Sequence, residues 1–233
     1  MPVNHGEHRD PVISVLEVYN NVLYRPVVSA AFGFSCLLQE ENLLFDTGSD
    51  GRILFQNLLA LHEDPRDIRA IVLSHEHIDH TGGLEALLVA NPGCAVYIHE
   101  GFGTRTRELI RKHGALRIIK GWEEITRGVF STGPLSDGIP EQSLVVSVKG
   151  GFLIICGCAH PHIGRIISHV SRFGPVQGAM GGFHTVSEED IRALGELRYV
   201  SPSHCTKNLD LIRRRCSKSF VQGGAGKIHR FAR

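Results

Sequence analysis

Short apolar segments alternate with amphipathic ones along the first half of the chain. Segments with the length and composition of strands occupy residues 13–18, 34–38, 43–45, 70–73 and 95–98. Between them, 52–61 and 84–90 carry apolar residues on one face, and Pro65 and Pro92 follow these segments as helix stops. The first half therefore predicts alternating strands and helices.

The second half repeats this style. Strands are predicted at 143–149, 152–155, 175–180 and 198–201, and helices at 104–112, 163–172, 188–197 and 207–216. Gly150-Gly151 predicts the tight turn of a hairpin. Because no repeat or Pro/Ser-rich linker divides the sequence, residues 1–233 are expected to form one domain of two mixed sheets with outer helices.

Composition excludes several classes of partner. Lysine and arginine number 25 against 24 acidic residues, so no basic field favours nucleic acid or an anionic membrane. The apolar runs are too short to span a bilayer. The N-terminus lacks a secretory signal, which predicts a cytoplasmic location and six reduced cysteines. A small-molecule partner is expected, and a homo-oligomer stays open.

The most informative stretch lies between the predicted strand 70–73 and the predicted helix 84–90. It places four metal-binding side chains within six residues: His75, His77, Asp79 and His80. His75 and His77 alternate by two, so both imidazoles can point to one side of an extended segment, while Asp79 and His80 can hold a neighbouring metal. Imidazole nitrogen with carboxylate oxygen suits zinc first, and also iron or manganese.

The sequence His-x-His-x-Asp-His after a strand resembles the signature of the metallo-β-lactamase superfamily. Residues 43–48, Leu-Leu-Phe-Asp-Thr-Gly, resemble that superfamily's upstream strand and Asp motif. The stretches 155–160, 181–184 and 201–206 resemble the branch described as dihydropterin-ribofuranosyl-aminobenzene-phosphate synthase-like hydrolases. The resemblance covers the whole chain in element order and implies an α/β fold, a four-layer αββα sandwich of two mixed sheets.

The resemblance also implies roles for single residues. His75 and His77 correspond to ligands of one metal, and Asp79 and His80 to ligands of a second, with Asp79 also orienting the water. His204 resembles the late histidine that completes the second site. Asp46 resembles a carboxylate that orients a metal-bound histidine.

One part of the ligand set departs from the superfamily pattern. Most hydrolases of the superfamily place a histidine in a Pro-Gly-His-Thr-like segment and then a Gly-Asp whose carboxylate bridges the metals. Here the strand 152–155 leads into Gly-Cys-Ala-His, and no Gly-Asp is present. His160 is therefore predicted as the missing ligand, and the two metals are expected to differ in affinity. Cys158 ranks below His160, because a free cysteine more often packs. His184 either faces the substrate as an acid or makes a structural hydrogen bond.

These residues predict a hydrolase in which a metal-bound hydroxide attacks a phosphoester, a phosphodiester or another anionic small molecule. The cationic residues in 103–112 and Lys207 favour an anionic substrate. Three alternatives stay open: a thioester or lactone hydrolase, a dinuclear iron redox site, and a non-catalytic metal-dependent ligand-binding protein. The remaining histidines are expected at the surface or, in the case of His5 and His8, in a flexible end: His62, His113, His169 and His229.

Overall fold

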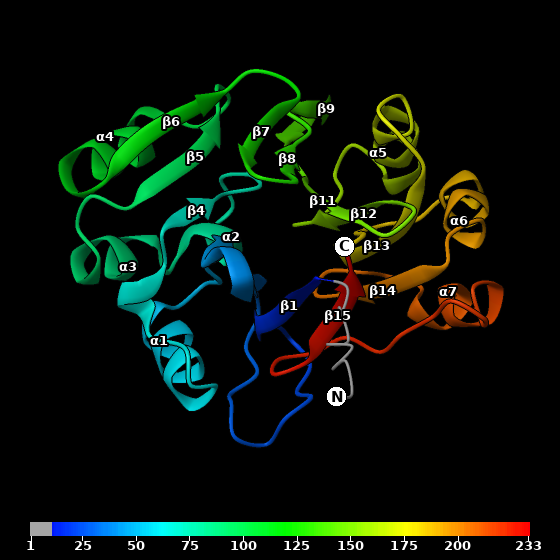
Figure 1. Cartoon of the computed structure of the whole chain (residues 1–233), viewed down its shortest axis with the longest axis horizontal. Helices are drawn as coiled ribbons and strands as arrows, with labels where there is room; N and C mark the ends of the chain where they lie inside the picture. Colours follow the sequence, from blue (N-terminus) through cyan, green and yellow to red (C-terminus); the bar gives the residue numbers. More distant parts are fainter. Residues whose placement is uncertain (1–10) are drawn as a thin grey trace, which may run out of the picture.

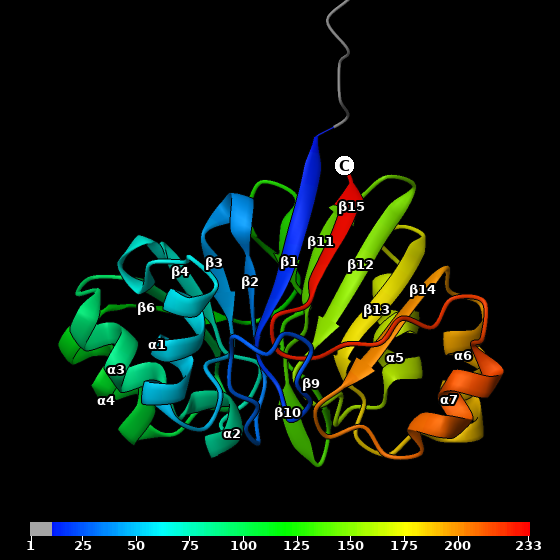
Figure 2. The ribbon, with the colours of Figure 1, turned by 90° about the horizontal axis from the view of Figure 1, so that it is seen from below.

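The computed structural model describes residues 11–233, so the predictions for His5 and His8 lie outside the described part. Two mixed sheets pack against each other, and helices cover the outer face of each (Figures 1 and 2). This is the αββα sandwich that the sequence predicts.

The first sheet has seven strands, in spatial order: β15 (Ile228–Ala232), β1 (Val12–Tyr19), β2 (Ser35–Leu38), β3 (Leu43–Phe45), β4 (Ala70–Val72), β5 (Ala95–His99) and β6 (Ala115–Ile119). Strands β3 to β6 are parallel, and β15, β1, β2 and β3 pair antiparallel. The predicted hairpin turn before Leu43 forms as a short 3₁₀ helix, η1 (Gln39–Glu41), closed by Asn42 in the left-handed conformation.

The second sheet has six strands, in spatial order: β14 (Tyr199–Ser203), β13 (Val176–Gly182), β12 (Gly151–Cys156), β11 (Leu144–Val148), β8 (Val129–Ser131) and β7 (Glu123–Thr126). Strands β12, β13 and β14 are parallel, and the others pair antiparallel. A separate ribbon joins β9 (Leu135–Asp137) to β10 (Ile139–Glu141).

The helices divide between the two outer faces. The first sheet is covered by α1 (Gly51–Ala60), α3 (Leu84–Ala90) and α4 (Thr104–His113), and the second by α5 (Ile163–Val170), α6 (Glu188–Gly195) and α7 (Leu209–Arg215). Two short helices lie in loops, η2 (Pro65–Asp67) and α2 (Ile78–Thr81).

Three hydrophobic clusters correspond to the three interfaces between these layers. Alternate residues of one strand serve different clusters: in β12, Leu153 and Ile155 face the other sheet, whereas Ile154 faces the helices. Leu144 and Val146 of β11 also join the cluster between the sheets. Strands buried on both faces read as continuous apolar runs, which is why the sequence shows them clearly.

The parallel strands of the two sheets end at the same edge of the sandwich. In Figure 2, β12 runs downward to the edge where α2 lies, opposite the C-terminus. The segments that follow β3, β4, β12, β13 and β14 therefore carry their side chains to one rim, where ligands commonly bind in α/β folds.

The surface prediction for His229 is wrong. His229 is 2% exposed. Its Nε2 lies 2.7 Å from Glu17 Oε1, and its Nδ1 contacts the hydroxyl of Tyr199. The adjacent Arg230 suggested a surface, but successive residues of a strand face opposite sides, and in β15 Arg230 is exposed while His229 is buried. In residues 11–233, no helix combines the length and apolar character that a membrane crossing needs.

Candidate metal centre

The loop after β4 carries the histidine-rich stretch across the rim. Strand β4 ends at Val72 and helix α2 begins at Ile78. His75 is 1% exposed, and its Nε2 lies 3.0 Å from Nδ1 of His77. Spacing by two along this extended segment thus puts both imidazoles on one side, with His77 at the exposed end.

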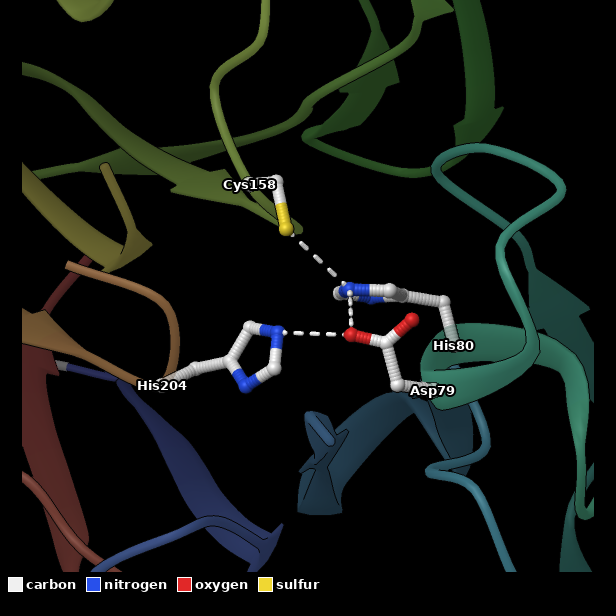
Figure 3. A group of neighbouring side chains, drawn as sticks. All are labelled: Asp79, His80, Cys158 and His204. Carbon is white, nitrogen blue, oxygen red and sulfur yellow. Dashed lines mark hydrogen bonds and ion pairs between the residues drawn. The ribbon is translucent and has the colours of Figure 1, made fainter. Parts of the chain in front are cut away.

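Asp79, His80, Cys158 and His204 point toward one another (Figure 3), and one ligand atom from each lies within 4.8 Å of the others. Asp79 Oδ2 is 3.1 Å from Nε2 of His204 and 3.4 Å from Nε2 of His80. Cys158 Sγ is 3.2 Å from the same His80 nitrogen. These four residues come from α2 and from the ends of β12 and β14, so only the tertiary fold assembles the group.

A second group shares Cys158 with the first. His75, Cys158 and His160 also offer ligand atoms within 4.8 Å of one another. The ring centroids of His75 and His80 are 4.2 Å apart, so the two groups adjoin. His77 lies beside the second group, with its ring centroid 5.2 Å from that of His160.

Asp46 is completely buried below both groups. Its Oδ1 accepts the Ser74 N–H, and its Oδ2 accepts the Ser74 hydroxyl and Nδ1–H of His80, each at 2.7 Å. Since Nδ1 carries the proton, the lone pair of His80 Nε2 faces the ligand group. Asp46 thus contacts His80 where the resemblance implies an orienting carboxylate.

Glu141 performs the corresponding task for His160, and sequence reasoning missed it. Its carboxylate accepts three successive backbone N–H groups, from Cys158, Ala159 and His160, at 2.9–3.0 Å, and also Nδ1–H of His160 at 2.9 Å. Burial would raise the pKa of Glu141, but these bonds and nearby His75 hold it well below its usual range. A single acidic residue before a predicted strand gives no local sign of this role.

Asn21 fixes the tautomer of His204 and was also missed. Asn21 Oδ1 accepts the Gly33 N–H at 3.0 Å, and Asn21 Nδ2 donates to the His204 carbonyl at 3.2 Å, which settles the orientation of the amide. His204 Nδ1, 3.0 Å from the same Oδ1, must therefore carry the proton. Its buried Nε2 makes no hydrogen bond of acceptable geometry among residues 11–233, although Asp79 Oδ2 lies 3.1 Å away.

This donor set fits a divalent cation. Three imidazoles use Nδ1–H to donate a hydrogen bond to a residue outside the ligand groups, which leaves the Nε2 lone pair available to a metal ion. These are His80, His160 and His204. A lone pair held beside a carboxylate oxygen is unfavourable unless a positive charge joins them. The residues present therefore fit the chemistry of a divalent-metal site, with candidate ligands and their hydrogen-bond partners both in place.

The pKa values of the ligand residues also indicate that this position favours a positive charge. Burial alone would lower the pKa of His80, but the carboxylates of Asp46 and Asp79 outweigh burial and raise it to about 10, so without a metal ion a proton takes the place of the cation at Nε2. Burial opposes ionisation of Asp79, yet the imidazoles of His204 and His80 beside its carboxylate keep its pKa far below normal. By contrast, burial lowers the pKa of His75 to about 2, so this imidazole is neutral and available as a ligand.

His184 lies next to the groups without joining either. It follows β13, and its ring centroid is 5.2 Å from that of His160. Burial, followed by the charges of His160 and Lys207, lowers its pKa. Its Nδ1 has a long contact of 3.4 Å with the Thr185 hydroxyl, so the ring is not held by a strong structural hydrogen bond.

Comparison with known proteins supports the resemblance seen in the sequence. A family model described as the metallo-beta-lactamase superfamily matches residues 32–203. A curated relative from Methanocaldococcus jannaschii, 7,8-dihydropterin-6-methyl-4-(beta-D-ribofuranosyl)-aminobenzene-5'-phosphate synthase, is 25% identical over 85% of this chain and 90% of its own. This relative carries the name of the branch that the sequence motifs resemble.

Solved structures share the fold. A metal-dependent hydrolase of the beta-lactamase superfamily superposes with a TM-score of 0.77 at 22% identity, covering 93% of this chain and 98% of the other. A diphosphatase from the PhnP family superposes with a TM-score of 0.65 at 12% identity, covering 95% and 98%. At these identities the likeness shows the architecture alone.

Proposed function

The chain belongs to the metallo-β-lactamase superfamily, and on this premise we propose that it is a metal-dependent hydrolase of a phosphoester, a phosphodiester or another anionic small molecule. The observation that carries the proposal is the convergence of the His80 and His204 imidazoles on Asp79 at one rim of the sandwich. Support for a phosphorylated substrate comes from the curated relative, whose name includes a phosphate.

We assign the ligands as the sequence suggested. His75, His77 and His160 would hold one divalent ion, and Asp79, His80 and His204 would hold the other, with zinc the first choice and iron or manganese next. Such ions, when bound, make hydroxide available from water near neutral pH and polarise a phosphoryl or carbonyl oxygen.

The chain's own residues would set the geometry around that chemistry. Asp46, Glu141 and Asn21 hold three imidazoles in one tautomer and one orientation, so little reorganisation is needed during reaction. Asp79 presents Oδ2 toward the ligand group, where it can also orient the attacking water.

His184 and Lys207 would meet the substrate. The Lys207 N–H donates to the His184 carbonyl at 2.7 Å, which ties the two residues together beside the second group. The exposed Lys207 ammonium favours a negative charge at this point, and the His184 imidazole can share a proton with the leaving group.

The cations of residues 103–112 support an anionic substrate less than the sequence suggested. Arg105 and Lys112 line a cavity of about 590 Å³ beside α2, but Glu76, Glu85 and Glu108 line it too. Because these charges nearly cancel, the preference for an anion rests on Lys207 and on the metal ions. As for other partners, we propose a small-molecule substrate in the cytoplasm, without nucleic acid or membrane; self-association stays open.

Metal content and a substrate panel test this function together. Elemental analysis would be made on wild type, His160→Ala and the matched control His113→Ala, which removes a histidine from the end of α4. The same preparations would be assayed on phosphomonoesters, phosphodiesters, thioesters and lactones. We expect metal and phosphoesterase activity in wild type and the control, and loss of both in His160→Ala.

Two results would count against the proposal in different ways. Full metal content in His160→Ala would show that the assignment of His160 is wrong. Turnover of thioesters or lactones but of no phosphoester would reject the substrate class and leave the metal site standing. A fully loaded wild type that hydrolyses nothing in the panel but binds a small molecule would instead favour the non-catalytic alternative.

A further inference from the structure

Cys158 lies between the two ligand groups, and its thiol has no role in the assignment above. The sequence contains no Gly-Asp that could supply a bridging carboxylate, and the side chain found at the shared position is that of Cys158. We propose that the Cys158 thiolate is a ligand shared by both metal positions and that it biases the centre toward thiophilic ions such as zinc. This inference rests on the metal centre of the proposed function and adds to it a residue that the six assigned ligands leave out.

The position of the sulfur is what a shared ligand requires. Cys158 is the one residue that belongs to both ligand groups found in residues 11–233. Its side chain is almost completely buried, at 3% exposure, and Sγ is 3.2 Å from Nε2 of His80. In Figure 3 the Cβ–Sγ bond points from the end of β12 toward His80 and Asp79.

The backbone that carries Cys158 is held firmly in place. Glu141 Oε1 accepts the Cys158 N–H at 2.9 Å. A Cβ on Gly182 would lie 2.2 Å from the Gly157 carbonyl oxygen and 3.1 Å from Cys158 Cα, so neighbouring strand β13 packs directly against the turn. Ala159, the next residue, has a left-handed φ of 53°, which costs energy unless the surroundings fix the turn.

Charge balance also favours a thiolate. Three carboxylates are buried in or directly around the groups: Asp46, Asp79 and Glu141. Two divalent ions would exceed their combined negative charge, and a fourth anion at the shared position would restore the balance that a buried site needs. A bound metal deprotonates a coordinating thiol, and sulfur ligands favour zinc over manganese or magnesium.

Cys205 provides a matched control because it is a second thiol at the same rim. Its Sγ contacts the Cys158 carbonyl at 3.9 Å, yet Cys205 belongs to neither ligand group among the described residues. Replacing Cys205 by serine therefore removes a neighbouring sulfur without removing the proposed ligand.

Cobalt absorption tests the proposal without relying on catalysis. The full chain would be stripped of metal and reloaded with cobalt(II) as wild type, Cys158→Ser, Cys158→Asp and Cys205→Ser. We expect wild type and Cys205→Ser to show a near-ultraviolet thiolate-to-cobalt charge-transfer band. Cys158→Ser should lose the band and part of its metal, whereas Cys158→Asp should lose the band but keep the metal, because its carboxylate supplies an anionic ligand at the same position.

The metal preference gives a second readout. In competition between zinc and manganese, Cys158→Asp should shift toward manganese relative to wild type, because oxygen replaces sulfur. A band that persists in Cys158→Ser, or disappears in Cys205→Ser, would overturn the assignment. Wild type that binds cobalt and hydrolyses phosphoesters without the band would reject the shared thiolate alone. Wild type that binds no metal would reject the proposed function with it.

Discussion

Asp46 Oδ2 lies 2.7 Å from Nδ1 of His80, and neither side chain is exposed. This pair links the end of β3 to the first turn of α2 across the parallel strands β3 and β4. The carboxylate decides which nitrogen of the imidazole is free, and the same carboxylate holds Ser74 at the start of the histidine-rich loop. One buried acid thus positions two parts of the candidate centre.

Asp46→Asn should weaken metal binding by about 10–100-fold, because an amide cannot accept from His80 and Ser74 in the way the carboxylate does. A competition titration against a chromophoric chelator measures this change. Asp67→Asn, at an exposed acid of η2, is the control and should bind as wild type does. Equal affinity in Asp46→Asn would contradict an orienting role.

Glu141→Gln should lower stability by about 1–3 kcal/mol even without metal, because three backbone N–H groups lose their anionic acceptor. Urea unfolding of the metal-stripped protein measures this loss, with exposed Glu123→Gln of β7 as the control. The metal content should also fall, since His160 loses the partner of its Nδ1. Stability equal to that of the control would show that the carboxylate charge does not anchor this turn.

Gly157→Ala should disturb the candidate metal centre by steric overlap, without removing any ligand. A Cβ at this position would lie 2.2 Å from Ser74 Oγ and 2.9 Å from Asp46 Oδ2, so the Ser74–Asp46 hydrogen bond must shift. We expect lower metal affinity, in the range of the Asp46 variant, together with some loss of stability. Gly195→Ala is the control, because a Cβ there meets nothing within 4 Å. Wild-type metal affinity in Gly157→Ala would show that the packing at this point tolerates a methyl group.

Asp190 should make folding stability depend on pH. Its carboxylate accepts from Ser187, Gly164 and His162, and although burial would raise the pKa of Asp190, these bonds lower it. A pKa lower in the folded state than in the unfolded chain gives stabilisation that is present above the unfolded value of about 4 and is lost as the pH falls below it.

Asp190→Asn should therefore be about 1–2 kcal/mol less stable than wild type at pH 7, and this difference should shrink as the pH falls from about 5 toward about 3. Urea unfolding at several pH values measures it. A pH-independent difference would mean that Asp190 acts by shape, not by charge.

Local patterns were enough for most of the secondary structure. The helix predicted at 84–90 is α3, and the strand predicted at 152–155 is the middle of β12. Both succeed because apolar periodicity reflects which faces are buried. The surface position predicted for His229 failed because the burial of a polar side chain depends on its partners, here Glu17 and Tyr199, which come from distant strands.

Some residues of the candidate site could be found from the sequence, and others only from the tertiary structure. The sequence alone singled out His75, His77, Asp79 and His80, because ligands within six residues leave a local signature. Glu141, Asn21 and the shared position of Cys158 were decided by the tertiary structure. These contacts join separate elements, 19 positions apart for Glu141 and His160 and 183 for Asn21 and His204, so they depend on how the two sheets meet and no local spacing records them.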